Sequence, residues 1–417
     1  MPGVDLGPFR TLTGVGWPSA PTGPALAFVG SFTTLGGAPF DNVAIYDTTA
    51  GVYLPNATYG RDPFGPSFAV NSAAVYQGDL YLGATNGDVY KRTGPQAYTQ
   101  IYNAAAGPCV DLVVWQDKLV IATREEYPVI WDGVTAAPVD WSVDVGSTFE
   151  LLVCALGVVT VASVERLCVL FEMSASAPIT LYCATSDDGV AWTFTPVTPA
   201  AGFNYLSYSN PGGYGAFPAG RRRWVEDGSG RFYLYRNFDD DGNGAGNNLQ
   251  GQVQRFDPAT NTLAAWNAPN PPFITDEYPR FDYNGATTFQ QASAAEVGGR
   301  LVVIGGQKRF SGDGVTFANC DRSVELLGTY GAGNSIGQVG GFLANEQAEI
   351  FQAHTGRIFC GFRDATQTGQ VTQLGGGLIS GGAALRLATF DGTAWAAWPD
   401  QPNGSVRGVF ELPALPV

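Results

Sequence analysis

A single pattern of strands and turns recurs along this 417-residue chain and restricts the folds open to it. Residues Ala25–Asn56 contain an alternating strand, a Gly-Gly turn, a second strand that ends in Tyr-Asp, and a short third strand. The same order returns in Gly251–Trp266 and in Ala384–Trp398. A unit of this size cannot bury both faces of its own sheet, so it must stack against copies of itself. The repeat therefore predicts an all-β fold built from stacked units.

Composition supports many short buried strands joined by tight turns. The chain has 55 Gly and 27 Pro residues, yet 45% of its residues are hydrophobic and 12% are aromatic. Disordered chains rich in Gly and Pro have far fewer apolar residues. The sequence shows no helical periodicity of useful length, and no stretch approaches the ~18 consecutive apolar residues of a membrane helix. We therefore expect no membrane insertion.

Six further segments read as hairpins, because β-branched or aromatic residues recur at every second position around a turn. These hairpins are Ser72–Thr85, Val110–Thr123, Leu151–Ser163, Arg221–Arg236, Ser293–Gly306 and Ala348–Phe362. The first repeat lacks an innermost strand, and Ser405–Pro413 reads as that strand. The pattern predicts a single seven-bladed β-propeller whose C-terminal strand completes the N-terminal blade and removes a free sheet edge.

The blade count and the domain limits follow from this organisation. Six blades is the alternative to seven, because the segment Phe149–Gly220 is ambiguous. We expect residues 1–24 to form an N-terminal extension and residues 25–417 to form the propeller domain. The later repeats are longer than the early ones, and the excess lies in loops from Ala200 onward. Long loops on a rigid scaffold are where binding residues tend to occur.

Several units resemble known propeller repeats. The segment Phe256–Trp266, with the sequence FDPATNTLAAW, resembles the kelch repeat. In that repeat an aromatic-Asp-Pro turn and an outer strand with a Trp complete a blade. The first unit is similar to a repeat of large bacterial and viral propeller proteins. Ser186–Trp192, with the sequence SDDGVAW, resembles the Asp-box of sialidase-type propellers. In that motif an Asp side chain accepts backbone N–H groups of the turn and the Trp packs between strands, so the resemblance implies a structural role.

Charge and cysteine usage restrict partners and compartment. The net charge of −15 disfavours nucleic acid as a partner. The six cysteines are widely spaced, and we expect most to be buried and reduced, with a disulfide between one pair among Cys154, Cys168 and Cys183 left open. The first residues, MPGVDLGPFRTLTG, have no basic region followed by an apolar one. We therefore expect synthesis in a cytosol without a signal peptide.

Two tyrosine-rich loops, Phe203–Phe217 and Phe273–Gly285, are the candidate binding segments. Aromatic faces stack on sugars and are enriched at protein interfaces, so tyrosines in long loops suit either ligand. The candidate binding residues are Tyr205, Tyr208, Tyr214, Tyr278 and Tyr283.

An acidic segment between these loops has the spacing of a calcium site. Asp239, Asp241 and Asn243 place oxygen atoms at alternate positions before Gly244, as in the start of a calcium-binding loop. Gln250 stands where a bidentate Glu closes such loops. Ca²⁺ at Asp239, Asp241 and Asn243 and an ordinary acidic surface turn are therefore both open.

No catalytic set is assignable. A copper oxidase of the galactose-oxidase type needs two His ligands, and His354 is the single His of the chain. A sialidase needs three converging Arg residues with a Tyr/Glu pair, and no spacing here assigns them. No phosphate-binding or nucleophile-elbow motif is present. We therefore expect a protein that is not an enzyme.

Three functional hypotheses follow. The first is a non-enzymatic structural or interaction propeller that binds other proteins of an assembly, as a homo-oligomer or with other chains, in a virion as a phage tail, spike or capsid-associated component. The second is an adhesin that binds a surface carbohydrate or receptor through the Tyr-rich loops. The third is a glycan hydrolase, which would need a pair of carboxylates in one pocket.

Overall fold

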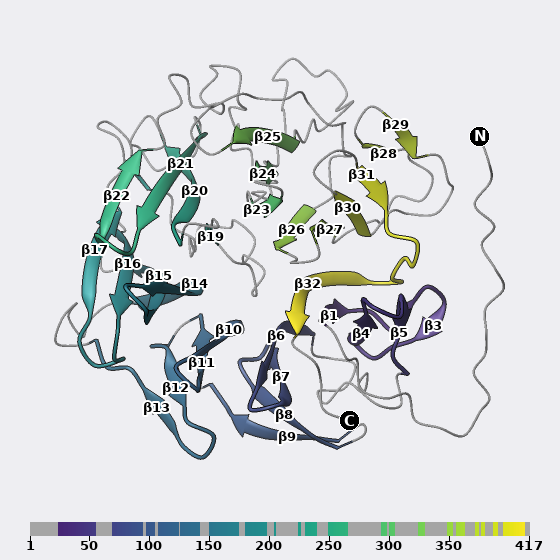
Figure 1. The fold of residues 1–417 in the computed structure, drawn as a ribbon, viewed down its shortest axis with the longest axis horizontal. Helices are drawn as coiled ribbons and strands as arrows, with labels where there is room; N and C mark the ends of the chain where they lie inside the picture. Colours follow the sequence, from purple (N-terminus) through teal and green to yellow (C-terminus); the bar gives the residue numbers. More distant parts are fainter. Residues whose placement is uncertain are drawn as a thin grey trace.

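In the computed structural model of the protein, antiparallel sheets are arranged in a ring (Figure 1). The structure describes residues 24–55, 69–94, 97–104, 107–124, 126–141, 150–174, 180–197, 204–205, 224–226, 230–239, 249–265, 293–297, 300–304, 324–329, 348–352, 356–362, 372–374, 377–379, 387–390 and 395–412. Seven sheets of three or more strands lie within these residues, and each forms one blade. The expected seven-bladed, all-β propeller is therefore confirmed, and the alternative of six blades is wrong.

Blades are numbered from the N-terminus, and their strands are given from the centre of the ring outward (Figure 1). Blade 1 consists of β32 (Ser405–Leu412), β1 (Ala25–Ser31), β4 (Val43–Asp47) and β5 (Val52–Tyr53). Blade 2 consists of β6 (Val70–Tyr76), β7 (Asp79–Ala84), β8 (Val89–Gly94) and β9 (Ala97–Tyr102). Blade 3 consists of β10 (Cys109–Trp115), β11 (Lys118–Thr123), β12 (Val129–Trp131) and β13 (Ala136–Pro138). Blade 4 consists of β14 (Glu150–Val161), β15 (Val164–Ser174), β16 (Thr180–Ser186) and β17 (Thr193–Val197).

The remaining blades follow the same order. Blade 5 has β18 (Asn204–Tyr205) and β19 (Trp224–Glu226) on its inner edge, then β20 (Phe232–Asp239), β21 (Leu249–Asp257) and β22 (Thr262–Ala265). Blade 6 consists of β23 (Ser293–Val297), β24 (Arg300–Ile304) and β25 (Val324–Thr329). Blade 7 consists of β26 (Ala348–Gln352), β27 (Ile358–Phe362), β30 (Leu387–Phe390) and β31 (Trp395–Ala397). Two small hairpins, β2 (Thr34–Leu35) with β3 (Ala38–Pro39) and β28 (Thr372–Leu374) with β29 (Gly377–Ile379), lie outside the blades.

The ring closes in blade 1, as the sequence predicts. Strand β32 pairs with the whole length of β1 and forms the innermost strand of that sheet (Figure 1). The chain that enters β32 is held on blade 1 by Asn403, whose Oδ1 accepts the N–H groups of Thr33 and Thr34 at 2.8 and 2.9 Å. Trp398 of the last blade donates its Nε1–H to the Tyr53 hydroxyl at 2.8 Å. The first and last blades are thus joined by a shared sheet and by side chains.

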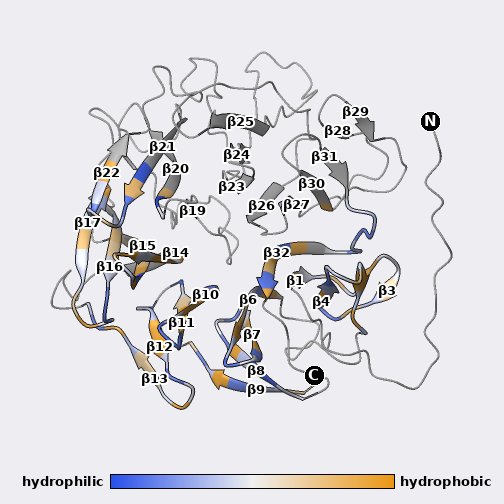
Figure 2. Ribbon diagram, in the orientation of Figure 1, coloured by the Kyte–Doolittle hydropathy of each residue, from blue (hydrophilic) through white to orange (hydrophobic). Residues whose placement is uncertain are grey.

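Apolar residues on both faces of the inner strands form the core between neighbouring blades, as in blades 1 and 2. In β1, Ala25, Ala27 and Val29 belong to the cluster shared with blade 2. Leu26 and Phe28, on the other face, belong to the cluster shared with blade 7. Figure 2 shows the resulting apolar stretches along the strands of the first blades. Because burial of a side chain such as Phe28 contributes roughly 1.5–3 kcal/mol, stacking of blades is the main source of stability.

The innermost strands of four blades carry a β-bulge at equivalent positions. The extra residue is Arg407 in β32, Asn71 in β6, Val110 in β10 and Cys154 in β14. A bulge redirects a side chain out of the regular ladder. In two of these strands the redirected side chain reaches a neighbouring blade: Arg407 Nη1 donates to Asn71 Oδ1 at 3.1 Å, and Asn71 Nδ2 donates to the carbonyl of Cys109 at 3.1 Å. Polar contacts therefore link blades 1, 2 and 3 close to the axis.

One predicted hairpin is wrong. We expected Leu151–Ser163 to contain two strands around Gly157, but the structure has one strand, β14, that ends at Val161. Gly157 lies within β14 and pairs with Cys168 of β15. The turn is Ala162-Ser163, where both residues have positive φ, 49° and 69°. Ala and Ser are not typical turn residues for this conformation, so the sequence pattern did not mark the turn.

A two-residue turn of the same kind joins the first and second strands in three consecutive blades. The central residues are Gln77-Gly78 in blade 2 (φ 51° and 83°), Gln116-Asp117 in blade 3 (φ 47° and 56°), and Ala162-Ser163 in blade 4. Positive φ at both positions is typical of type I′ turns, whose twist matches that of the flanking strands. In a four-stranded meander this turn and the turn between the third and fourth strands lie at the same end of the sheet. We call the face of the ring that carries both kinds of turn the A–B face.

Three cysteines, Cys109, Cys168 and Cys183, are buried thiols. Cys109, Cys168 and Cys183 lie outside any disulfide. Each possible pairing among Cys154, Cys168 and Cys183 includes Cys168 or Cys183, so the disulfide left open by the sequence does not form. Burial raises the pKa of the Cys109 thiol to about 12, which makes it an unreactive apolar side chain.

Candidate functional site

The structure describes one of the five candidate tyrosines. Tyr205 lies in β18 and pairs with Phe238 of β20. The other four, Tyr208, Tyr214, Tyr278 and Tyr283, lie outside the described residues.

The inner edge of blade 5 is divided between two short strands. Both β18 and β19 pair with β20 on the side opposite β21, with Tyr205 beside Phe238 and Trp224 beside Leu234. The inner edge is therefore formed by two segments that are separated in the sequence by residues 206–223. In blades 2, 3 and 4 a single strand occupies this edge. The Tyr-rich segment predicted from the sequence therefore begins at β18, on the inner edge of its blade, and the rest of it lies outside the described residues.

The predicted calcium segment begins at the end of β20. Asp239 is the last residue of that strand and pairs with Asn204 of β18. Asp241 and Asn243 lie outside the described residues, as does His354. Within the part of the chain that the structure describes, no group of three or more His, Cys, Asp or Glu side chains could hold a metal ion. The same part contains no helix that could cross a membrane.

An aspartate preceded by an aromatic residue caps the same turn in three blades. In each, the Asp ends or directly follows the third strand, and its Oδ1 accepts one or two backbone N–H groups of the next turn. Asp47 accepts from Thr49 and Ala50 at 2.8 and 2.9 Å. Asp132 and Asp257 do the same in blades 3 and 5. These hydrogen bonds hold the pKa of the exposed Asp132 carboxyl below its usual range. The repeated aspartates therefore cap turns.

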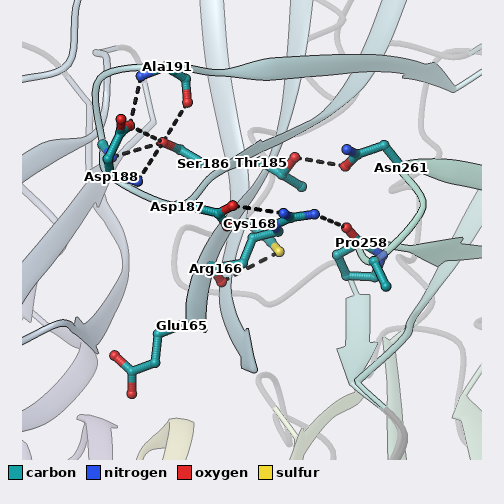
Figure 3. A network of polar contacts seen from close by, with 12 residues as sticks. Glu165, Arg166, Cys168, Thr185, Ser186, Asp187, Asp188, Ala191, Pro258 and Asn261 are labelled. Carbon is teal, nitrogen blue, oxygen red and sulfur yellow. Dashed lines mark hydrogen bonds and ion pairs between the residues drawn. The ribbon is translucent and has the colours of Figure 1, made fainter. Parts of the chain in front are cut away.

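The segment Ser186–Trp192 forms a turn with the contacts expected from its resemblance (Figure 3). Asp188 Oδ1 accepts the N–H groups of Val190 and Ala191, both at 2.8 Å. Ser186 Oγ accepts the N–H of Gly189 at 2.8 Å and donates to the Ala191 carbonyl at 2.7 Å. Hydrogen bonds from the Val190 and Ala191 backbone lower the pKa of Asp188.

Trp192 and Gly189 attach this turn to blade 3. The Trp192 ring meets that of Trp141 with centroids 5.0 Å apart in an edge-to-face arrangement. Gly189, with φ of 77°, lies so close to Ile130 and Trp115 that a Cβ atom there would be 2.9 Å and 3.2 Å from their side chains. The motif is therefore a structural joint between blades 3 and 4, as expected.

Arg166 joins three turns of the A–B face across blades 4 and 5 (Figure 3). Its Nε and Nη2 donate to the two carboxylate oxygens of Asp187 at 2.7 and 2.8 Å, and its Nη1 donates to the carbonyl of Pro258 at 2.5 Å. Nearby, Thr185 Oγ1 donates to Asn261 Oδ1 at 2.8 Å. The Arg166 hydrogen bonds lower the pKa of Asp187. Sequence reasoning missed this residue, because its partners lie 21 and 92 residues away.

Buried carboxylates of the described residues serve structural contacts. Asp88 is 6% exposed and accepts four side-chain donors, from Asn86, Tyr90, Gln100 and Asn103, at 2.6–3.0 Å. Asp111, 1% exposed, accepts the N–H groups of Leu112 in its own strand and Leu156 in blade 4. The hydrogen bonds of these two carboxylates therefore hold strands and blades together.

One tyrosine–carboxylate pair has a geometry that catalysis can use. The Tyr102 hydroxyl donates to Glu126 Oε2 at 2.7 Å, and Thr123 Oγ1 donates to the same oxygen at 3.4 Å. A nucleophilic phenolate needs a lowered pKa. Burial of the ring and the hydrogen bond to Glu126 instead raise the pKa of Tyr102, so the phenol keeps its proton. The pair joins blades 2 and 3 as a structural contact.

Comparisons with known proteins describe the fold alone. No family model and no curated protein matches the chain. Among solved structures, the chain is similar to the Dos1 propeller, with 12% identity, a TM-score of 0.46, and 93% of this chain and 84% of that chain covered. It is also similar to YCF48 bound to D1 peptide (11% identity, TM-score 0.43, 90% and 95% covered). A third is the six-bladed fungal lectin of Aleuria aurantia (13% identity, TM-score 0.36, 80% and 95% covered). The order of strands in its own sheets identifies the chain as a β-propeller.

Proposed function

We propose that this chain is a non-enzymatic interaction propeller that acts as a structural component of a protein assembly. The observation that carries the proposal is the use of its described ionisable groups. Asp88, Asp111, Asp187 and Glu126 each accept hydrogen bonds that fix turns or join blades. The hydrogen bonds of these polar groups hold the blades in fixed positions. A rigid propeller can present a fixed surface to its partners.

The proposed setting is a virion, as a phage tail, spike or capsid-associated protein. This part of the proposal rests on the resemblance of the repeats to kelch-like and Asp-box units of bacterial and viral propellers. The capped aromatic-Asp turns of blades 1, 3 and 5 and the Asp188 turn support that resemblance.

The test is co-purification with native particles. Antibodies against the full chain should label intact particles from the source organism, and the chain should co-sediment with them through a density gradient. A chain found wholly outside any particle or complex would contradict the proposal.

A second candidate is binding of a surface carbohydrate or receptor. The observation that favours it is the position of Tyr205 on the inner edge of blade 5, because the Tyr-rich segment then begins at the innermost strand position of the ring. The triple variant Tyr205→Ala, Tyr208→Ala, Tyr214→Ala should lose binding on a glycan or cell-surface array. Variants at Tyr278 and Tyr283 test the second loop. An array without hits for the unaltered chain would contradict this candidate.

Calcium binding at Asp239, Asp241 and Asn243 is proposed alongside it. Bound Ca²⁺ would stabilise the folded chain by mass action, so EGTA should lower the melting temperature and added Ca²⁺ should restore it. An unchanged melting temperature, or an equal response in Asp241→Asn, would contradict the site.

A further inference from the structure

The exposed large hydrophobic side chains of the described residues lie on one face of the ring. Five large hydrophobic residues are highly exposed: Val52 (52%), Val114 (40%), Val134 (80%), Val164 (46%) and Val190 (85%). Each lies in or beside a turn between the first and second strands or between the third and fourth strands of its blade. All five therefore lie on the A–B face. Four of them belong to the adjacent blades 3 and 4.

Contacts between the turns make this part of the A–B face continuous. Gln116 in blade 3 donates its Nε2–H groups to the carbonyls of Glu165 and Asp187 in blade 4, at 3.0 and 2.7 Å. The Glu165 carboxylate in turn accepts the N–H of Gln116 at 2.8 Å. On the other side, the Tyr76 hydroxyl of blade 2 donates to the carbonyl of Asp117 at 2.8 Å. The turns that bear the valines are thus fixed relative to one another.

A fixed surface of this kind lowers the cost of binding. Turns that are already ordered lose little conformational freedom when a partner docks. The valines gain nothing from exposure in the free chain, and contact with a partner would remove their side chains from water. Exposure of single apolar residues is ordinary, but confinement of all five to one face is not explained by the fold.

The charges around the valines are mostly negative. Asp117, Asp132, Glu165, Asp187 and Asp188 are exposed on the turns of blades 3 and 4. The cations on the same turns have contacts within the chain: Arg166 pairs with Asp187, and Lys118 Nζ lies 5.8 Å from the centre of the Trp115 ring. The surface therefore presents a negative potential to an approaching molecule.

We propose that the A–B face of blades 3 and 4 docks a partner protein segment in which Lys or Arg side chains flank apolar ones. The apolar residues of the partner would cover Val114, Val134, Val164 and Val190, and its cations would meet the surrounding carboxylates. This inference rests on the proposed role as an interaction propeller and specifies the surface and the chemistry of its partner. Opposite charge would speed association and fix orientation, while the apolar contacts would supply affinity.

A second copy of this chain fits the surface less well. Face-to-face pairing of two A–B faces would oppose the carboxylates of one copy to those of the other, and the whole chain carries a net charge of −15. Like charges set against each other disfavour the complex. Self-association through this face is therefore an outcome that would overturn the inference.

The experiment uses the full chain and a synthetic peptide of alternating lysine and leucine as the probe, with a glutamate–leucine peptide of equal length as its control. Binding is followed by fluorescence anisotropy at two salt concentrations. The lysine–leucine peptide should bind, bind more weakly at high salt, and bind about tenfold more weakly to Val134→Ser/Val190→Ser. These two valines are the most exposed large hydrophobic residues of the part of the chain that the structure describes, so this variant should keep the melting temperature of the parent.

Val52→Ser is the matched control, because Val52 is the first residue of β5, directly after the equivalent turn of blade 1, and lies outside the proposed surface. Its affinity for the peptide should equal that of the parent. Asp117→Asn/Glu165→Gln should weaken binding and flatten its salt dependence. Equal loss in Val52→Ser, no loss in Val134→Ser/Val190→Ser, or equal binding of the glutamate–leucine peptide would overturn the surface. Failure of the assembly role itself would appear separately, as absence of the chain from native particles.

Discussion

Single buried carboxylates do much of the positioning in this ring. Asp88 organises four side-chain donors from blade 2, and Asp111 connects blade 3 to blade 4 through the N–H of Leu156. Removal of the acceptor of a buried donor destabilises the fold by more than the net contribution of the hydrogen bond, because the donor stays buried without a partner. Substitution at these positions therefore tests how strongly one residue determines the local geometry.

Asp88→Ala should lower the free energy of unfolding by about 2–4 kcal/mol, since it leaves several amide and hydroxyl donors without an acceptor. Asp88→Asn keeps one acceptor oxygen and should cost less. Urea denaturation followed by tryptophan fluorescence measures both. Equal stability of Asp88→Ala and the parent would show that water replaces the carboxylate without cost.

The pH dependence of stability should reflect the turn-capping aspartates. Backbone N–H groups hold the pKa of Asp132 and of Asp188 below the usual value of an aspartate in the folded chain. Their ionised forms therefore contribute stability above the unfolded pKa, and this contribution is lost as the pH falls through the lower folded pKa. Asp188→Asn keeps an acceptor but cannot ionise, so its melting temperature should fall less steeply than that of the parent below about pH 4. Identical acid profiles of the two proteins would contradict the assignment.

At the scale of single elements, the β14–β15 hairpin carries a turn that its sequence does not favour. Ala162 and Ser163 both have positive φ, which costs an L-residue other than Gly, Asn or Asp roughly 1 kcal/mol. The two strands nevertheless pair along their full lengths, from Glu150 beside Ser174 to Val161 beside Val164. Packing of these strands against the neighbouring blades outweighs the local preference.

Ala162→Asn/Ser163→Gly should therefore stabilise the chain, by about 1–2 kcal/mol, because Asn-Gly is the preferred type I′ pair. Ala162→Val should do the opposite, since a β-branched residue is poorly tolerated at positive φ. Thermal denaturation of the two variants beside the parent measures both effects. Destabilisation by the Asn-Gly pair would mean that the turn is not type I′.

The β14–β15 hairpin also shows which strands and turns could be predicted from the sequence. Alternating apolar residues predicted strands correctly in β6, β7, β10 and β11, where Gly78 or a polar pair marks the turn. In β14 the apolar run continues without a turn residue, and Gly157 suggested a break that does not exist. Turns marked by typical turn residues could therefore be predicted from the sequence, but a turn stabilised by packing of its strands could not.

The candidate site shows the same division between local and distant contacts. The Asp188 turn could be predicted, because all of its hydrogen bonds lie within six residues. The contact of Arg166 with Pro258 and that of Gln116 with Glu165 join different blades, and no spacing in the sequence indicates them. The exposed valines are likewise visible as a group only when the turns are assembled on one face.

At the scale of the whole molecule, closure by β32 determines whether blade 1 has a free edge. The strand pairs with β1 and contributes Val406, Val409 and Leu412 to the cores on both sides of the blade. Without it, the inner edge of β1 would present unpaired backbone groups and apolar side chains to water.

Deletion of residues 405–417 should therefore abolish cooperative unfolding and cause aggregation. Deletion of residues 414–417, which lie beyond β32, is the control and should leave the chain monodisperse. Size-exclusion chromatography and circular dichroism distinguish the two. A soluble, cooperatively folding 405–417 deletion would show that ring closure is dispensable.

Pairing of β1 with β32 also orders events during synthesis of the chain. Strand β1 is among the first described segments to leave the ribosome, and its partner β32 is the last. At typical translation rates the interval is about 20–80 s, far longer than a hairpin needs to form. During that time blade 1 must wait with an open apolar edge while the other blades assemble. The order of β1 and β32 therefore sets a period in which the nascent chain exposes an unpaired sheet edge, and the speed of translation sets the length of that period.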